Sequence, residues 1–139
     1  MIEQTIRPSR PFEPISPEVE AIGKIVLDAA DVVHNNLGPG LLESVYEACL
    51  AYELRKQDLA VETQSIIPVK YQEVFVEAGL RLDLWVEKSV LVELKAVETM
   101  VSLYEAQLLS YLKITGCRLA FLINFHVKRL KDGIKRMVL

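Results

Sequence analysis

Two acidic side chains and an amine, Asp83, Glu93 and Lys95, lie close together in an otherwise apolar stretch of the sequence. Apolar and polar residues alternate over 80–86 and again over 90–95, which predicts two strands. If residues 87–89 form the loop between them, Asp83 faces Glu93 across an antiparallel pair; a two-residue loop would break this register. Directly opposed Cβ atoms are about 4.5–5.5 Å apart, so the two carboxylates repel each other. A divalent cation, assisted by Lys95, would neutralise them.

This set of residues suits metal-assisted hydrolysis of a phosphodiester. Mg²⁺ prefers oxygen ligands, and sites that handle phosphates often use one or two carboxylates and keep several waters. A lysine beside such a pair can orient or deprotonate the attacking water, or stabilise the charge that builds on a phosphate. The alternative is an ion pair on a solvated strand, because E-x-K is a short and common motif. The strongly aliphatic setting of Asp83 and Glu93 favours the catalytic interpretation.

Two helical pairs could add to this site. Glu43 and Tyr46 are three residues apart, and so lie on one helix face. Glu43 is either a further metal ligand directed at the two strands or a carboxylate that favours the positive end of its helix. Gln107 and Tyr111 are four apart on a later helix. Gln107 could bind a phosphate or hold Lys95; otherwise it is a surface residue beside a core tyrosine.

The elements that must position these residues can be read from caps and periodicity. Ser16 is expected to cap a first helix that ends at Gly38. A second helix should run over about 41–57, with Leu42, Val45, Cys49 and Tyr52 as its apolar stripe. Ser102 and Glu105 match a capping box for a third helix, which Gly116 closes. The expected strands cover 61–71, with Pro68 at an edge or bulge, then 74–86, 90–95, 119–125 and 134–138.

This order of elements predicts an α/β fold with one mixed β-sheet flanked by helices. Three successive strands imply an antiparallel meander, to which the later strands add. A chain of 139 residues is expected to form one domain. We therefore expect a proline-containing, extended N-terminal arm over 1–15 and a single domain over 16–139.

Charge and cysteine content limit the possible partners. The net charge of −3 counts against a broad nucleic-acid surface. Seven basic residues nevertheless crowd the last quarter, either as a solvated face or as a local phosphate-binding patch. Cys49 and Cys117 are expected to be buried free thiols. The sequence shows neither the apolar core of a signal peptide nor a membrane-spanning run, which favours a cytoplasmic protein without a membrane partner.

The joint pattern of motifs resembles a known family. Residues 40–46 read G-x-x-E-x-x-Y, and they precede Asp83, Glu93-Leu94-Lys95 and Gln107-x-x-x-Tyr111. Over about residues 17–139 the chain resembles the GxxExxY proteins, a small-domain group of the PD-(D/E)XK nuclease superfamily. The resemblance implies a restriction-endonuclease-like core.

The resemblance also implies a role for each motif residue. Asp83 and Glu93 match the metal-binding acids, Lys95 the catalytic lysine, Glu43 the helix glutamate, and Gln107 with Tyr111 the exonuclease-type helix motif. Leu82 stands where the superfamily often has proline, and Asp58 where the group tends to have glycine.

Two hypotheses follow from these observations. The first is a nuclease that uses Mg²⁺ or Mn²⁺ and acts on DNA or RNA. The second is a nuclease-fold module for binding or assembly that does not turn over. The acidic isoelectric point and small size favour the second, because little surface remains for a long duplex. Either protein could form a homodimer or serve a larger protein partner.

Overall fold

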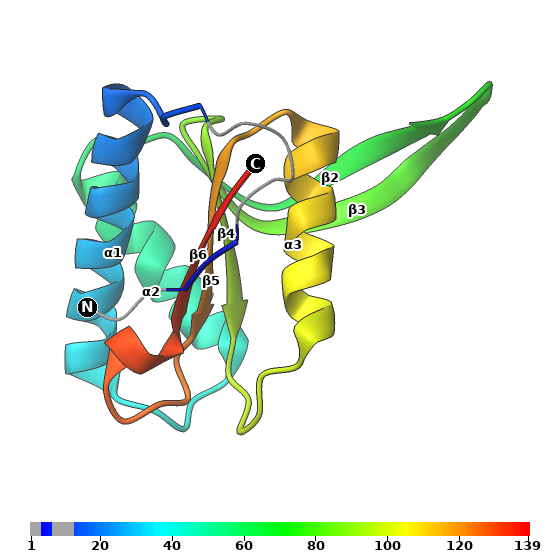
Figure 1. Cartoon of the computed structure of the whole chain (residues 1–139). Helices are drawn as coiled ribbons and strands as arrows, with labels where there is room; N and C mark the ends of the chain where they lie inside the picture. The colour runs from blue at the N-terminus through cyan, green and yellow to red at the C-terminus, as the bar shows by residue number, and fades with distance from the viewer. Residues whose placement is uncertain (1–3, 7–12) are drawn as a thin grey trace.

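A six-stranded mixed sheet forms the centre of the computed structural model, which describes residues 4–6 and 13–139. The strand order is β1-β6-β5-β4-β3-β2, and helices cover both faces (Figure 1). The helices are α1 (Pro17–Leu37), α2 (Glu43–Lys56) and α3 (Ser102–Thr115), with a short 3₁₀ turn η1 (Leu130–Gly133). The strands are β1 (Gln4–Ile6), β2 (Val61–Tyr71), β3 (Val74–Val86), β4 (Val90–Lys95), β5 (Leu119–Asn124) and β6 (Ile134–Val138). The predicted α/β architecture is confirmed.

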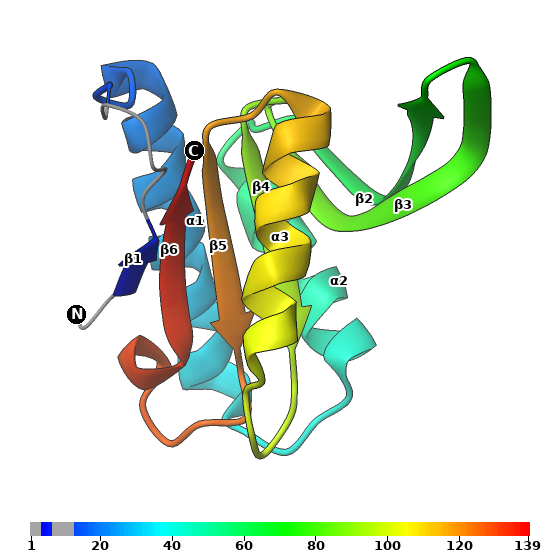
Figure 2. The ribbon, with the colours of Figure 1, turned by 45° about the vertical axis from the view of Figure 1, so that its right-hand side comes forward.

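The middle of the sheet is apolar on both faces. β5 pairs in parallel with β4 and antiparallel with β6, and all six of its residues are buried. α1 and α2 pack on one face, and α3 packs on the other (Figure 2). A strand that is covered on both sides reads as a continuous apolar run, which is why its position could be predicted.

Helix starts agree with the sequence in one case and differ in another. Ser16 caps α1, and its hydroxyl accepts a hydrogen bond from the Val19 N–H at 3.3 Å. The capping box predicted at Ser102 is wrong. Val101 has the extended backbone of a cap residue, Ser102 is already helical, and no side chain caps this helix. The end of α3 is as predicted, because Gly116 adopts φ +77, which glycine tolerates without a steric penalty.

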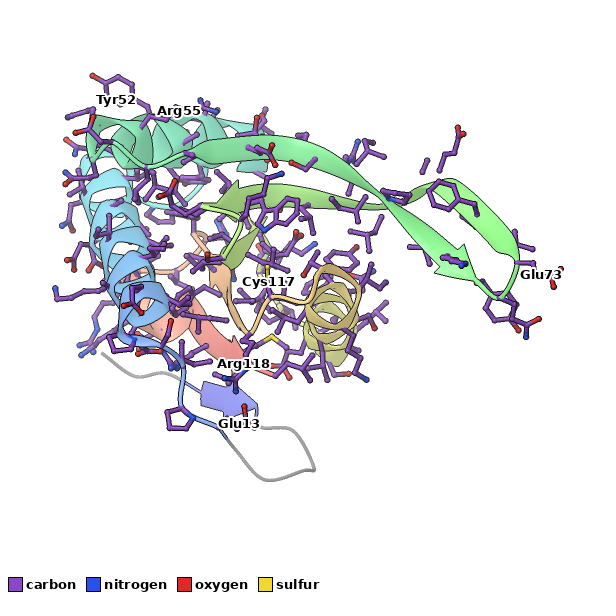
Figure 3. The ribbon with its side chains drawn as sticks, turned by 90° about the horizontal axis from the view of Figure 1, so that it is seen from above. Glu13, Tyr52, Arg55, Glu73, Cys117 and Arg118 are labelled. Carbon is purple, nitrogen blue, oxygen red and sulfur yellow. The ribbon has the colours of Figure 1, made fainter. Side chains whose placement is uncertain are left out.

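The predicted apolar stripe of α2 is also wrong. Leu42 precedes the helix and is 73% exposed, and Tyr52 is 62% exposed and lies on the outer side of the helix (Figure 3). The residues that α2 buries are Tyr46, Leu50, Ala51 and Leu54. α2 is therefore rotated relative to the expectation, and its N-terminal turn brings Glu43 toward the sheet.

β2 and β3 continue past the body of the protein as a two-stranded arm with Glu73 at its far end (Figure 3). β2 is the edge strand, and the register shifts between Ile67 and Val69, so the prediction of an edge or a bulge at Pro68 is confirmed. The arm exposes a set of large apolar residues: Ile66, Tyr71, Val74, Phe75 and Val76. An isolated two-stranded ribbon is only marginally stable in water.

The N-terminal segment contributes one strand to the other edge of the sheet. β1 pairs in parallel with β6, so part of the predicted N-terminal arm joins the sheet. Residues 1–3 and 7–12 of that arm lie outside the described part of the chain. No described helix is long and apolar enough to cross a membrane.

Tyr46 ties the α1–α2 connection to the core. Its ring is fully buried and stacks on Phe125 with the ring centroids 4.5 Å apart. Its hydroxyl donates to the Gly38 carbonyl at 2.6 Å and accepts from the Leu41 N–H at 3.1 Å. This tyrosine therefore fixes the loop that precedes Glu43.

Tyr46→Phe should lower the free energy of unfolding by about 1–3 kcal/mol, because it leaves main-chain groups of the loop without their partner. Urea denaturation followed by circular dichroism measures this. Tyr52→Phe is the matched control on the exposed side of the same helix and should change stability by less than about 0.5 kcal/mol. Equal effects of the two substitutions would contradict the role assigned to the Tyr46 hydroxyl.

Candidate active site

The β3–β4 turn sets the register on which the site depends. Glu87 and Lys88 both have positive φ, +52 and +53, as in a type I′ turn, and the Ser89 N–H donates to the Val86 carbonyl at 2.9 Å. Val86 pairs with Val90, and Leu84 pairs with Val92. The three-residue loop predicted from the sequence is confirmed, and it places Asp83 opposite Glu93.

Asp83 and Glu93 meet where the two strands stop pairing through their main chains. The ladder ends at Leu84, and beyond it each carboxylate bonds to the other strand. The Asp83 N–H donates to Glu93 Oε1 at 3.0 Å, and the Leu94 N–H donates to Asp83 Oδ2 at 2.9 Å. Side-chain oxygens thus bond to the main chain across this strand pair, and the strands hold the two carboxyl groups together.

The close approach of the two acids changes the pKa of Glu93. Burial, followed by the charge of Asp83, raises the pKa of Glu93 from 4.5 to about 8. The Lys95 charge opposes the increase but does not cancel it. The two acids therefore lie in surroundings that would favour an added positive charge.

Lys95 comes from the end of β4, and its ammonium group lies over an aromatic ring of α3. Its Nζ is 4.3 Å from the centroid of the Tyr104 ring, a cation–π distance. The Lys95 charge also acts on Glu43, whose pKa is raised by burial and then by Asp83. Lys95 is therefore close to the acids of both β4 and α2.

α2 and α3 approach the two acids from opposite faces of the sheet. Glu43 comes from the first turn of α2, and Tyr111 comes from α3. Burial, followed by the charges of Glu93 and Asp83, raises the pKa of Tyr111, which places its hydroxyl within their field. Tyr111 therefore lies near the two acids, and its role at the site stays a prediction.

Gln107 has the fewest contacts with the rest of the candidate site. It lies between Tyr104 and Tyr111 on the same face of α3, because residues three and four apart share a helix face. Its side chain is exposed and makes no hydrogen bond to any described residue. It is available for a ligand, and its predicted bond to Lys95 is not formed.

The structure adds three residues that the sequence analysis missed. Glu47 is one turn after Glu43, and burial is the first cause that raises its pKa. Gln64 of β2 donates from Nε2 to Glu47 and to Asp83 Oδ1, the latter at 3.3 Å. The charge of Arg81 acts on Glu47 and Tyr111. The four-residue spacing of the two glutamates was visible in the sequence, whereas nothing marked Gln64.

The donor set fits a cation such as Mg²⁺ or Mn²⁺. Asp83 and Glu93 supply two carboxylates, and Mg²⁺ is usually bound by one or two together with waters and substrate phosphates. Among residues 4–6 and 13–139 no group of three or more histidine, cysteine, aspartate or glutamate side chains is close enough to hold a metal ion. Glu43 therefore stands near the pair without completing a three-ligand cluster.

Several basic residues of the last quarter are engaged in contacts within the chain. Lys135 pairs with Glu105, and Arg136 pairs with Glu20. Arg118 donates to three main-chain carbonyls of the two termini. These three cations stabilise the fold, so the predicted phosphate-binding patch is reduced to the remaining basic residues.

Comparison with known protein families supports the relationship that the geometry suggests. The family model described as the PD-(D/E)XK nuclease superfamily matches residues 20–137, which include every residue of the candidate site. Neither the curated proteins nor the solved structures contain a match.

Glu93→Gln should flatten the pH dependence of stability in metal-free buffer. The unfolded chain releases the Glu93 proton near pH 4.5, whereas the folded protein keeps it until about pH 8. Between these values the folded state binds more protons, so the free energy of unfolding of the wild type falls as pH rises. Urea denaturation across this range measures the slope. Glu77→Gln, on the exposed arm, is the control and should keep the wild-type slope. If Glu93→Gln also keeps the wild-type slope, the raised pKa of Glu93 is contradicted.

Proposed function

This chain belongs to the PD-(D/E)XK nuclease superfamily, and from that premise we propose that it is a metal-dependent nuclease that hydrolyses phosphodiester bonds in DNA or RNA. The observation that carries the proposal is the Asp83–Glu93 pair, with each carboxylate bonded to the main chain of the opposite strand. Residues 16–139 form the proposed nuclease unit. Their α/β sheet, flanked by helices, agrees with a restriction-endonuclease-like fold.

Asp83 and Glu93 would hold Mg²⁺ or Mn²⁺, with Glu43 beside them. Such a cation lowers the pKa of bound water and polarises a phosphate oxygen. Lys95 orients the attacking water or stabilises the charge that builds on the phosphate, and the Tyr104 ring limits where its ammonium group can lie. Gln107 and Tyr111, which share a face of α3, position a phosphate. In this mechanism β3 and β4 supply the charged side chains, and α3 supplies the side chains that orient the phosphate.

We propose that the protein belongs to the GxxExxY group, and the G-x-x-E-x-x-Y motif at residues 40–46 supports this. Tyr46 anchors the loop before α2 through its hydroxyl. Glu43 then starts the helix next to the acids. Tyr46 of the motif thus stabilises the loop, whereas Glu43 of the motif contributes a carboxylate to the site. We propose a cytoplasmic setting as well, which the two free thiols of Cys49 and Cys117 support.

The proposal predicts cleavage that requires Mg²⁺ or Mn²⁺. Purified protein is incubated with single-stranded, duplex and flapped DNA and with RNA, with each metal and with chelator. Lys95→Ala and Asp83→Asn should each lower the cleavage rate at least about a hundredfold, because the first removes a positioned positive charge and the second removes a metal ligand. Lys24→Ala, an exposed lysine on α1 paired with Asp28, should cleave at the wild-type rate. Cleavage by Lys95→Ala or Asp83→Asn at the wild-type rate would contradict the proposed mechanism.

The arm favours a second candidate function, a binding or assembly module. It exposes Phe75, Val74 and Tyr71 near the far end of a ribbon that extends past the body of the protein (Figure 3). Residues 66–79 of the arm include two acidic side chains and one basic side chain, which favours a protein partner or a second copy of the chain over a phosphate backbone. A folded wild-type protein that cleaves none of the substrates above would support this function.

A further inference from the structure

The backbone of β2 departs from a regular strand at Gln64. Its φ is +53, in the left-handed region that residues other than glycine rarely adopt. The β2–β3 ladder pairs Thr63 with Leu84 and Ser65 with Leu82, but it omits the pair between them, Gln64 and Asp83. The register is the same on both sides of this gap. The irregularity is therefore local, and it lies directly opposite Asp83.

At the same point, the apolar side chains of β3 switch from one face of the sheet to the other. Leu84 packs in the core layer under α1 and α2, whereas Leu82 packs in the layer under α3. In a regular strand these two residues would share a face. Asp83 therefore lies where the strand twists from one layer to the other. This explains how its carboxylate reaches the main chain of Leu94 instead of either core.

The Gln64 amide links this carboxylate to α2. Its Nε2 donates to Asp83 Oδ1 at 3.3 Å and to a carboxylate oxygen of Glu47. An amide nitrogen has two donor hydrogens, so one side chain can satisfy both acids. Asp83 thus has one oxygen held by the Leu94 N–H and the other by Gln64.

We propose that Gln64 is a positioning residue: its amide fixes the rotamer of Asp83 for a divalent cation and separates that acid from Glu47. The inference rests on the proposed function, because it assigns Asp83 to the metal. Side chains that orient a metal ligand typically contribute about tenfold to a hundredfold in metal affinity. A backbone in a disfavoured region next to such a site agrees with this role.

Gln64→Gly tests the amide without straining the fold. Glycine adopts φ near +53 freely, so the variant keeps the backbone and loses only the side chain. Gln72→Gly is the matched control, because Gln72 also has positive φ, +52, and among the described residues its amide bonds to Tyr71 alone, at 3.4 Å. Isothermal titration with Mn²⁺ gives the dissociation constant, and thermal denaturation gives the midpoint of unfolding.

We expect Gln64→Gly to bind Mn²⁺ about tenfold to a hundredfold more weakly than the wild type, with no loss in its unfolding midpoint, and Gln72→Gly to bind as the wild type does. Wild-type affinity in Gln64→Gly would overturn the inference and leave the proposed function standing. A wild-type protein and a Gln72→Gly variant that both bind no Mn²⁺ would overturn the proposed function and the inference with it.

A second variant keeps the test decisive if Gln64→Gly does not fold. Gln64→Asn retains a residue that tolerates positive φ, but its side chain is one methylene too short to reach both acids. It should show the same weakening of Mn²⁺ binding. Wild-type affinity in this variant would overturn the inference.

Discussion

The site depends on one constraint: β3 and β4 hold two carboxylates together where their main chains stop pairing. Each acid accepts a main-chain N–H of the opposite strand, so these hydrogen bonds fix both side chains. The two acids are thus held together by geometry, and burial followed by the Asp83 charge raises the pKa of Glu93 to about 8. A cation that binds there would replace the Glu93 proton and gain two oriented ligands.

The surrounding elements arrange positive charge and hydrogen-bond donors around this pair. Lys95 follows on the same strand and is held over Tyr104, while α2 brings Glu43 through the loop that Tyr46 anchors. Gln64 joins α2 to β3 on the side away from β4. The long β2–β3 arm does not take part in this arrangement, so the apolar residues on it are free for another role.

The sequence predicted the strands of the site well because their patterns are local. The alternation on β3 and β4 and the polar loop between them determine the register. The orientation of α2 could not be predicted, since its apolar residues permit more than one stripe and the packing of Tyr46 on Phe125 selects one. Gln64 was missed for a different reason. Glutamine rarely adopts a positive φ, least of all inside a strand. The conformation of Gln64 is explained by its hydrogen bonds to α2 and β3, which the sequence does not reveal.

The most direct test of the account is an anomalous difference map from crystals soaked in Mn²⁺. We expect one manganese peak in contact with the carboxylates of both Asp83 and Glu93, with the β3–β4 register preserved. A peak bound to only one of these acids, a peak elsewhere, or no peak in well-ordered crystals would contradict it.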